Sequence, residues 1–251
     1  MTLQLCAAAV THPGLIRSGN QDAVHAGRWL VAVADGMGGM AAGDLASSLA
    51  MTATVALDVG MPDDKLVPAL RGAVESASAR IRAAIAEDPD REGMGTTLTA
   101  LLCSSTGTRL ALAHVGDSRA YLLRDGVLKQ MTRDDTLVQM LIEQGVITPE
   151  EASRHPRRAV VIQALQGDEV SATYTTFVPV AGDRWLLCSD GLSNVVSEES
   201  ITDALMSYPD PRECAQRLVD LALRAGGPDN ITAAVTDVTN GPSEGEGQVT
   251  G

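Results

Sequence analysis

The order of the expected secondary-structure elements limits the fold of this 251-residue chain more than any other feature: strands come in runs and helices come in pairs. Parallel strand–helix–strand alternation is weak, which favours antiparallel sheets with helices packed outside them. We therefore predict an α+β fold. No internal linker is visible, so we expect one domain over residues 1–239. Residues 240–251 are rich in Gly, Ser and Glu and are predicted to form a disordered tail.

Hydrophobic periodicity places the expected elements along the chain. Strands are predicted from apolar or alternating runs at 3–10, 29–34, 96–103, 109–115, 120–124, 127–132, 170–178, 185–189 and 231–238. Helices are predicted at 46–59, 65–87, 135–144, 201–206 and 211–224. Residues 17–22 are expected to form a polar loop, and residues 147–167 are less regular.

Charge and composition exclude several classes of function. Lys and Arg number 19 against 32 Asp and Glu, a net charge of −13, which disfavours nucleic acid and anionic membranes as partners. Aromatic residues make up only 2% of the chain, so stacking platforms for bases are not expected. No apolar run approaches membrane-spanning length, and the four cysteines form no metal-binding or disulfide pattern. We expect a cytoplasmic, reducing location, either for the whole protein or for the catalytic part of a longer membrane-anchored one.

Two apolar strands each end in an Asp-Gly pair, Asp35-Gly36 and Asp190-Gly191. A strand end is a rigid origin for a carboxylate, and the glycine lets another atom approach closely. Three further aspartates lie in polar or Gly-containing turns: Asp22, Asp117 and Asp229. Asp-Gly is also a common turn dipeptide, so each pair taken alone is equally consistent with a plain turn.

Converging carboxylates repel one another unless a cation neutralises them. A site made of oxygen ligands without His or Cys favours Mg²⁺ or Mn²⁺. Such a site suits a two-metal hydrolase, in which the ions lower the pKa of a water molecule. Arg17, five residues before Asp22, is able to hold a phosphate by two parallel hydrogen bonds. The alternative for Arg17 is a solvated loop arginine.

Six motifs carry a resemblance to a known family. In chain order they are Arg17-x-x-Asn-Gln-Asp22, Ala34-Asp-Gly-Met-Gly-Gly39, Gly93-Met-Gly-Thr-Thr97, His114-Val-Gly-Asp-Ser-Arg119, Cys188-Ser-Asp-Gly-Leu192 and Gly227-Pro-Asp-Asn-Ile-Thr232. From about residue 17 to residue 238, the chain resembles bacterial metal-dependent serine/threonine protein phosphatases of type 2C (PPM), above all actinobacterial members.

The resemblance implies a four-layer α-β-β-α sandwich, two antiparallel sheets flanked by helix pairs. It implies two or three Mn²⁺ or Mg²⁺ ions in the cleft between the sheets. The implied reaction is direct attack of a metal-bridging water on phosphoserine or phosphothreonine, without a phosphoenzyme. The implied partners are phosphorylated proteins, namely serine/threonine kinases and their targets, and the implied state is a monomer.

The resemblance also assigns metal ligands. Asp35 is implied to bridge two metals, while Asp190 and Asp229 hold the first metal and the carbonyl of Gly36 reaches the second. Asp22 is implied to hold metal-bound water. Asp117, together with Asp190, matches a third metal position.

Substrate contacts follow from the same resemblance. Arg17 matches the clamp on the substrate phosphate. Residues 136–168 match a flap beside the active site. Three arginines of this segment are candidates to touch phosphopeptide, with a solvated loop as the alternative: Arg154, Arg157 and Arg158.

Three positions depart from the family pattern. Met37 stands where animal members carry a His, and Met40 stands where many bacterial relatives carry one. Gln21 replaces a frequent Glu. These departures motivate the alternative of a catalytically weak, phosphatase-like binding or regulatory domain. His114, on an alternating strand, is interpreted as a packed or hydrogen-bonded core histidine.

A cysteine phosphatase is the second alternative, because Cys103 and Arg109 have the C-x₅-R spacing of a phosphate loop. That chemistry needs a helix N-terminus after the loop. Residues 109–115 alternate like a strand instead, so the cradle for phosphate is not expected.

Overall fold

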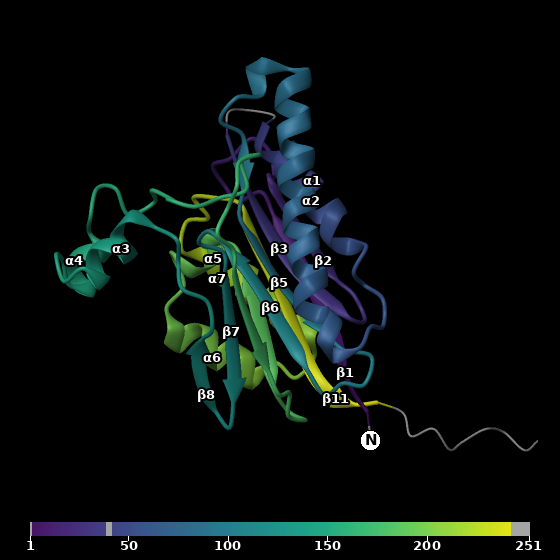
Figure 1. Ribbon diagram of the computed structural model, residues 1–251. Helices are drawn as coiled ribbons and strands as arrows, with labels where there is room; N and C mark the ends of the chain where they lie inside the picture. Colours follow the sequence, from purple (N-terminus) through teal and green to yellow (C-terminus); the bar gives the residue numbers. More distant parts are fainter. Residues whose placement is uncertain (1, 39–41, 242–251) are drawn as a thin grey trace, which may run out of the picture.

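The computed structural model describes residues 2–38 and 42–241 and consists of two antiparallel sheets packed face to face between layers of helices (Figure 1). This arrangement confirms the predicted α+β sandwich. Met40 and residues 242–251 of the predicted tail lie outside the described residues. Asn240, predicted to begin the tail, is instead the last residue of a strand.

Both sheets are assembled from segments distant in sequence. The order of the first sheet is β1 (Leu3–His12), β11 (Ile231–Asn240), β10 (Arg184–Cys188), β7 (Arg119–Arg124) and β8 (Val127–Gln130). The order of the second is β2 (Asp22–Ala26), β3 (Leu30–Met37), β5 (Leu98–Cys103), β6 (Leu110–Val115) and β9 (Thr173–Phe177), with β4 (Gly95–Thr96) paired to the end of β3.

Two pairs of helices cover the outer faces of the sheets. Helices α1 (Ala42–Val55) and α2 (Leu66–Glu87) pack on the second sheet, and α6 (Glu198–Ser207) and α7 (Pro211–Arg224) on the first. Short helix α5 (Asp190–Ser193) follows β10 directly. Helices α3 (Leu137–Glu143) and α4 (Pro149–Ser153) stand away from both sheets (Figure 1). Single 3₁₀ turns occur at Asp63–Lys65 and Pro89–Arg91.

Small and branched side chains fill the space between the sheets. Val33 and Leu101 of the second sheet meet Trp185 and Leu187 of the first, all fully buried. Because the chain has few aromatic rings, Ala, Val and Leu supply most of the buried apolar surface that stabilises the sandwich. No helix in the described part of the chain has the length and apolar character needed to cross a membrane.

Several predicted boundaries are wrong for tertiary reasons. Asp22, predicted to end the polar loop at 17–22, is instead the first residue of strand β2, because it pairs with Asp35 of β3. The helix predicted at 46–59 runs from Ala42 to Val55. The strand predicted at 170–178 begins only at Thr173, where pairing with β6 begins. Helices α4 and α5 were not predicted, because each is shorter than two helical turns.

Candidate metal centre

A cavity of about 380 Å³ collects most of the predicted site residues at one end of the sandwich. Asp35, Asp117, Asp190 and Asp229 line it together with Arg17. The other lining residues are Gln21, Gly36, Met37, Gly38, Thr97, Ala159, Val160 and Val161. Four carboxylates from four separate segments of the chain therefore share one small space, as the sequence predicted.

Asp35 lies near the end of β3, where hydrogen bonds fix its main chain. Its N–H donates to Thr97 Oγ1 at 3.0 Å, and its carbonyl accepts from the Thr97 N–H at 2.9 Å and from Thr96 Oγ1 at 3.0 Å. Burial, followed by repulsion from Asp22 and Asp190, raises the pKa of Asp35 well above its usual range. The ionised carboxylate therefore needs a nearby positive charge.

Asp190 and Asp229 approach the same space from the first sheet. Asp190 is the first residue of α5, and its Oδ2 accepts from Asn194 Nδ2 at 3.0 Å. Burial, followed by repulsion from Asp229, raises the pKa of Asp190. Asp229 accepts from Arg17 Nη2 at 2.8 Å, so the fold brings the Arg17 guanidinium to this cluster.

Asp22 lies behind the cavity, opposite Asp35 in the β2–β3 register. Its Oδ2 accepts from Ser189 Oγ at 2.7 Å and from Thr232 Oγ1 at 2.6 Å, whereas its Oδ1 is buried without a hydrogen-bond partner. Burial raises the pKa of Asp22 to about 6. A buried carboxylate oxygen without a donor is costly, and water bound to a cation would supply one.

Asp117 occupies the turn that follows β6. Burial, followed by repulsion from Asp190, raises its pKa to about 7. The turn is tight: Gly116 has φ +101°, and a Cβ there would lie 2.6 Å from Thr97 Cγ2. Ser118 and Thr97 are joined by a short hydroxyl–hydroxyl bond beside it.

The predicted role of the Asp-Gly glycines is confirmed by close approaches of the backbone. A Cβ on Gly36 would lie 2.1 Å from the carbonyl oxygen of Gly43, and one on Gly191 would lie 1.9 Å from that of Asn230. Any side chain at either position would therefore displace main chain that shapes the cavity.

The donor set fits hard divalent cations. The cluster offers only oxygen ligands, and the pKa values of Asp22, Asp35, Asp117 and Asp190 are all raised by burial and mutual repulsion. Within residues 2–38 and 42–241, no three His, Cys, Asp or Glu side chains are already arranged to enclose an ion. Oxygen donors of this kind suit Mg²⁺ or Mn²⁺, which are held by few carboxylates and keep several waters.

Asn230 is a site residue whose role the sequence did not reveal. Its Nδ2 donates to the carbonyls of Pro13 (2.9 Å) and Gly19 (2.8 Å), and its Oδ1 accepts from the Gln21 N–H (2.7 Å). Asn230 therefore ties down both ends of the loop that carries Arg17. Its only sequence signal was its place in the last motif.

A second cavity, of about 330 Å³, adjoins the first and shares Asp117 and Asp190 with it. Residues of α3, α4 and the segment after them form one wall. Arg158 lines this cavity, so the fold brings it to the site, whereas Arg154 and Arg157 are exposed and line neither cavity.

His114 is a core residue, as predicted. It is 3% exposed, and its ring nitrogens contact Thr99 Oγ1 and the carbonyl of Arg133, each at 2.9 Å. Burial lowers its pKa, so the neutral form is favoured.

The cysteine-phosphatase alternative is wrong. Cys103 is buried at the end of β5, and burial raises the pKa of its thiol to about 11. The chain continues into strand β6, not into a helix. The low-pKa thiolate and the helical cradle for phosphate are both missing from this described region.

Comparison with known proteins agrees with this site. The family model for protein phosphatase 2C matches residues 17–222. The chain is 52% identical over 240 residues to the serine/threonine protein phosphatase PstP of Mycobacterium tuberculosis, a match covering 96% of this chain and 46% of PstP. It is 36% identical over 247 residues to the protein phosphatase PhpP of Streptococcus pneumoniae, covering 94% of this chain and 98% of PhpP. The chain thus spans about half the length of the mycobacterial relatives.

Solved structures lead to the same family. A crystal structure of M. tuberculosis PstP has a TM-score of 0.91 and 51% identity, covering 94% of this chain and 100% of that chain. Another, of the PstP catalytic domain in complex with two manganese ions, has a TM-score of 0.89 and 51% identity, covering 95% and 100%. With the family model matching most of its length, the chain belongs to the protein phosphatase 2C family.

Proposed function

We propose that this chain hydrolyses phosphoserine and phosphothreonine in phosphoproteins by direct attack of a water held between two divalent ions. The observation that carries the proposal is the convergence of four carboxylates and Arg17 on one cavity. The names of the relatives, which are serine/threonine phosphatases, support the same reaction.

We assign the metal ligands as follows. Asp35 would be shared by two ions, Asp190 and Asp229 would hold the first, and the carbonyl of Gly36 would serve the second. Asp117 would join Asp190 in holding a third. When bound, Mn²⁺ or Mg²⁺ supplies Lewis-acid stabilisation of phosphoryl charge and a nucleophilic water at neutral pH.

The protein's own groups orient the reactants. Asp22, with one oxygen fixed by Ser189 and Thr232, presents its free Oδ1 as an acceptor for water. Arg17 is 54% exposed in its side chain and is joined to Asp229 through one nitrogen. Its remaining N–H groups are available to hold two phosphoryl oxygens.

No phosphoenzyme is expected, because the proposed nucleophile is water. The hydroxyls of Ser118 and Thr97 bond to each other, and those of Ser189 and Thr232 are turned toward Asp22, which lines neither site cavity. Rapid quenching with ³²P-labelled phosphopeptide should recover label only as inorganic phosphate. A stable covalently labelled chain would contradict direct attack by water.

Removal of divalent metal should abolish turnover. We expect EDTA to lower the rate of p-nitrophenyl phosphate hydrolysis by at least about 10²-fold, since stabilisation by the metals is worth several kcal/mol. Excess Mn²⁺ should restore the rate, and the same EDTA saturated with Mn²⁺ before addition serves as the control for nonspecific effects. Activity insensitive to chelation would refute the metal assignment.

Loss of the Asn230 clamp should impair phosphate binding more than chemistry. In Asn230→Ala three part-buried backbone partners lose their bond, each at a cost of about 0.5–1.5 kcal/mol, part of which appears in substrate binding. We expect kcat/KM to fall by roughly ten- to a hundredfold, mainly through KM, and inhibition by inorganic phosphate to weaken in parallel. Asn240→Ala, at the exposed end of β11, is the matched control. An unchanged KM with a lower kcat would contradict the clamp role.

We propose that the catalytic domain comprises residues 1–239, with a flap at 136–168 whose Arg158 contacts phosphopeptide from the second cavity. We infer action as a monomer in the cytoplasm on serine/threonine kinases and their targets, with no part for nucleic acid or direct membrane contact.

A catalytically weak binding or regulatory domain is the second candidate. Met37 and Gln21 both line the cavity, and neither side chain is able to donate a proton to the leaving group as an acid. This candidate predicts metal-dependent phosphopeptide binding without turnover, which single-turnover measurements with excess protein would distinguish from slow catalysis.

A further inference from the structure

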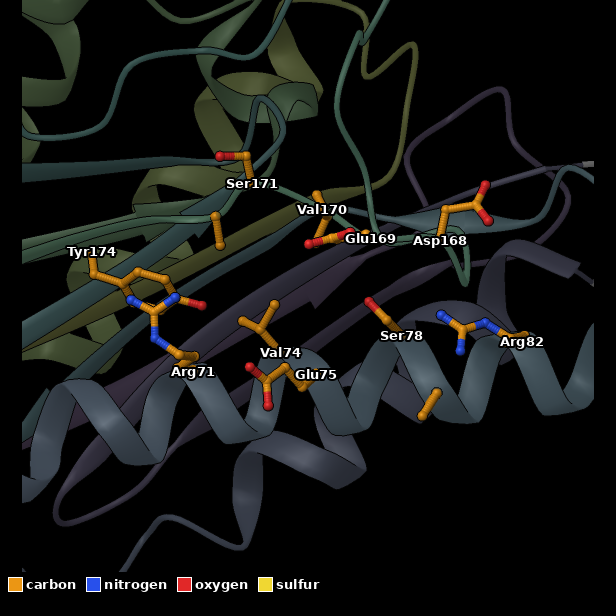
Figure 2. Close-up of a pocket in the computed structure, with 12 residues that line it drawn as sticks. Arg71, Val74, Glu75, Ser78, Arg82, Asp168, Glu169, Val170, Ser171 and Tyr174 are labelled. Carbon is orange, nitrogen blue, oxygen red and sulfur yellow. The ribbon is translucent and has the colours of Figure 1, made fainter.

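A cavity of about 710 Å³ lies away from the metal centre. It runs between α2 and residues 168–174, the extended segment that returns from the flap into β9 (Figure 2). It shares no lining residue with the 380 Å³ cavity that contains Asp35. We call it the α2 groove.

The face of α2 that lines the groove is long enough to accompany an extended chain. On α2 its lining includes Arg71, Glu75, Ser78 and Arg82, at the three- and four-residue spacing of one helix face. Eleven residues of helix span roughly 16 Å, the length of about five residues of extended peptide.

A buried hydroxyl in this groove has no partner. Ser78 is 6% exposed, and its Oγ makes no hydrogen bond within the described residues. Other helical hydroxyls bond backward to their own helix: Thr54 donates to the carbonyl of Ala50 and Thr202 to that of Glu198. The Ser78 hydroxyl instead points toward the segment at 168–170 (Figure 2). An unpaired buried hydroxyl is destabilising, and a polar ligand atom would supply the missing partner.

Among the described residues, the charged side chains of the groove form no ion pairs with one another, although Arg82 Nε donates to the carbonyl of Gly167 at 2.6 Å. Within the described part of the chain none of them takes part in an ion pair: Arg71, Glu75, Arg82, Asp168 and Glu169. Three carboxylates disfavour a simple anion as ligand, and two guanidinium groups disfavour a simple cation. A ligand that complements this groove therefore carries both positive and negative charges.

The wall of the groove opposite α2 presents backbone N–H and C=O groups. Residues 168–171 precede β9, and their backbone groups make no hydrogen bond to other described residues. Small apolar side chains between the charges, Val74, Ala79 and Ala172, leave room for a second backbone. The one aromatic ring, Tyr174, is already covered by the Arg71 guanidinium at 4.6 Å, which disfavours a stacked nucleotide base.

We propose that the α2 groove binds an extended peptide segment of a protein partner, one in which basic and acidic side chains alternate with small apolar ones. The peptide's backbone would pair with residues 168–171, and its hydrogen-bonding groups would satisfy Ser78. Because the groove and the metal centre share no residue, this binding adds affinity for the partner without contacting the reacting atoms.

The proposal is tested with four pools of labelled, N-acetylated, C-amidated octapeptides. In each, alternate positions are Ala, Ser or Val, and the others are Lys and Glu mixed, Lys alone, Glu alone, or Gln. Fluorescence anisotropy should detect binding of the mixed pool at about tenfold lower protein concentration than any other pool. Hydrogen exchange should slow at residues 168–172 when the mixed pool binds. Equal binding of all pools, or none at about 1 mM protein, would overturn the proposal.

Substitutions in the groove test whether it binds peptide or serves only the stability of the fold. Glu169→Lys and Ala79→Trp alter exposed lining positions, so both should fold, and each should weaken binding of the mixed pool by about tenfold. Ser78→Ala should weaken binding while raising the Tm of the free protein, because it removes an unsatisfied hydroxyl. Ser76→Ala, on an adjacent face of α2 and outside the groove lining, is the control.

Catalysis provides the independent check. All four variants should hydrolyse p-nitrophenyl phosphate at the wild-type rate, and Asp190→Asn should bind the mixed pool normally. Peptide binding that survives both Glu169→Lys and Ala79→Trp would overturn the groove as its location. Loss of phosphatase activity in Asp190→Asn with intact peptide binding leaves this proposal standing on its own.

Discussion

Replacing Asp190 by asparagine should lower kcat/KM for a phosphothreonine peptide by at least about 10³-fold, equivalent to some 4 kcal/mol of transition-state stabilisation. Asp190 lines both cavities of the site, so its charge serves more than one proposed ion position. Asparagine keeps the volume and an oxygen able to accept from Asn194, so the change removes charge and leaves shape intact.

The same substitution should stabilise the metal-free fold. Burial and repulsion from Asp229 raise the pKa of Asp190, which means that its charge is unfavourable when no cation is bound. The Tm of metal-free Asp190→Asn should therefore exceed that of the wild type, while the increase in Tm produced by Mn²⁺ should shrink. Differential scanning fluorimetry with and without Mn²⁺ measures both.

Asp203→Asn on the exposed face of α6 is the matched control, since it removes one carboxylate far from the cavities. It should change neither kcat/KM nor the response to Mn²⁺. An Asp190→Asn enzyme retaining more than about a tenth of wild-type kcat/KM, with an unchanged response to Mn²⁺, would refute the assignment of Asp190 as a metal ligand.

Replacing Arg184 by methionine should cost about 3–5 kcal/mol of folding stability, the usual effect of breaking a buried ion pair from one side. Arg184 is 8% exposed. Its Nε and Nη2 donate to Asp237 at 2.6 and 2.7 Å. Its nitrogens also donate to the carbonyls of Leu205, Tyr208 and Pro209. One guanidinium thus joins β10, β11 and the α6–α7 connection.

For a chain of this size the loss corresponds to a decrease in Tm of roughly 10 °C, measurable by calorimetry. Arg224→Met, at the exposed end of α7, should lower the Tm by little, because an exposed arginine has water as an alternative partner. Well below its Tm, Arg184→Met should keep wild-type kcat/KM, since Arg184 lines neither site cavity. A Tm decrease no larger than that of Arg224→Met would contradict the buried-clamp interpretation.

Much of the site was predictable because its residues lie at strand ends and in turns, which local sequence patterns mark. Asp35 and Asp190 each follow an apolar strand and precede a glycine, and both patterns are local. The backbone approaches at Gly36 and Gly191 follow from the same local rule. Asp117 and Asp229 were identified in the same way, from their Gly-containing turns.

Other features required the assembled sheets. Strand β2 has no apolar periodicity, and only its pairing with β3 places Asp22 opposite Asp35. Asn230 is separated by 209 residues from Gln21, so no local pattern relates the two. Of three candidate arginines after α4, the fold selects Arg158 alone to line a site cavity.

The sequence by itself determined the class of fold, the family and the oxygen-rich chemistry of the metal centre, because periodicity, turn residues and ligand type are local properties of the chain. Only the tertiary structure decided which groups lack partners. Whether Asp22 Oδ1 and Ser78 Oγ are satisfied depends on atoms that segments distant in sequence bring, or fail to bring, within hydrogen-bonding distance. The metal centre and the α2 groove each contain one of these two oxygen atoms that lack a hydrogen-bond partner within the described residues.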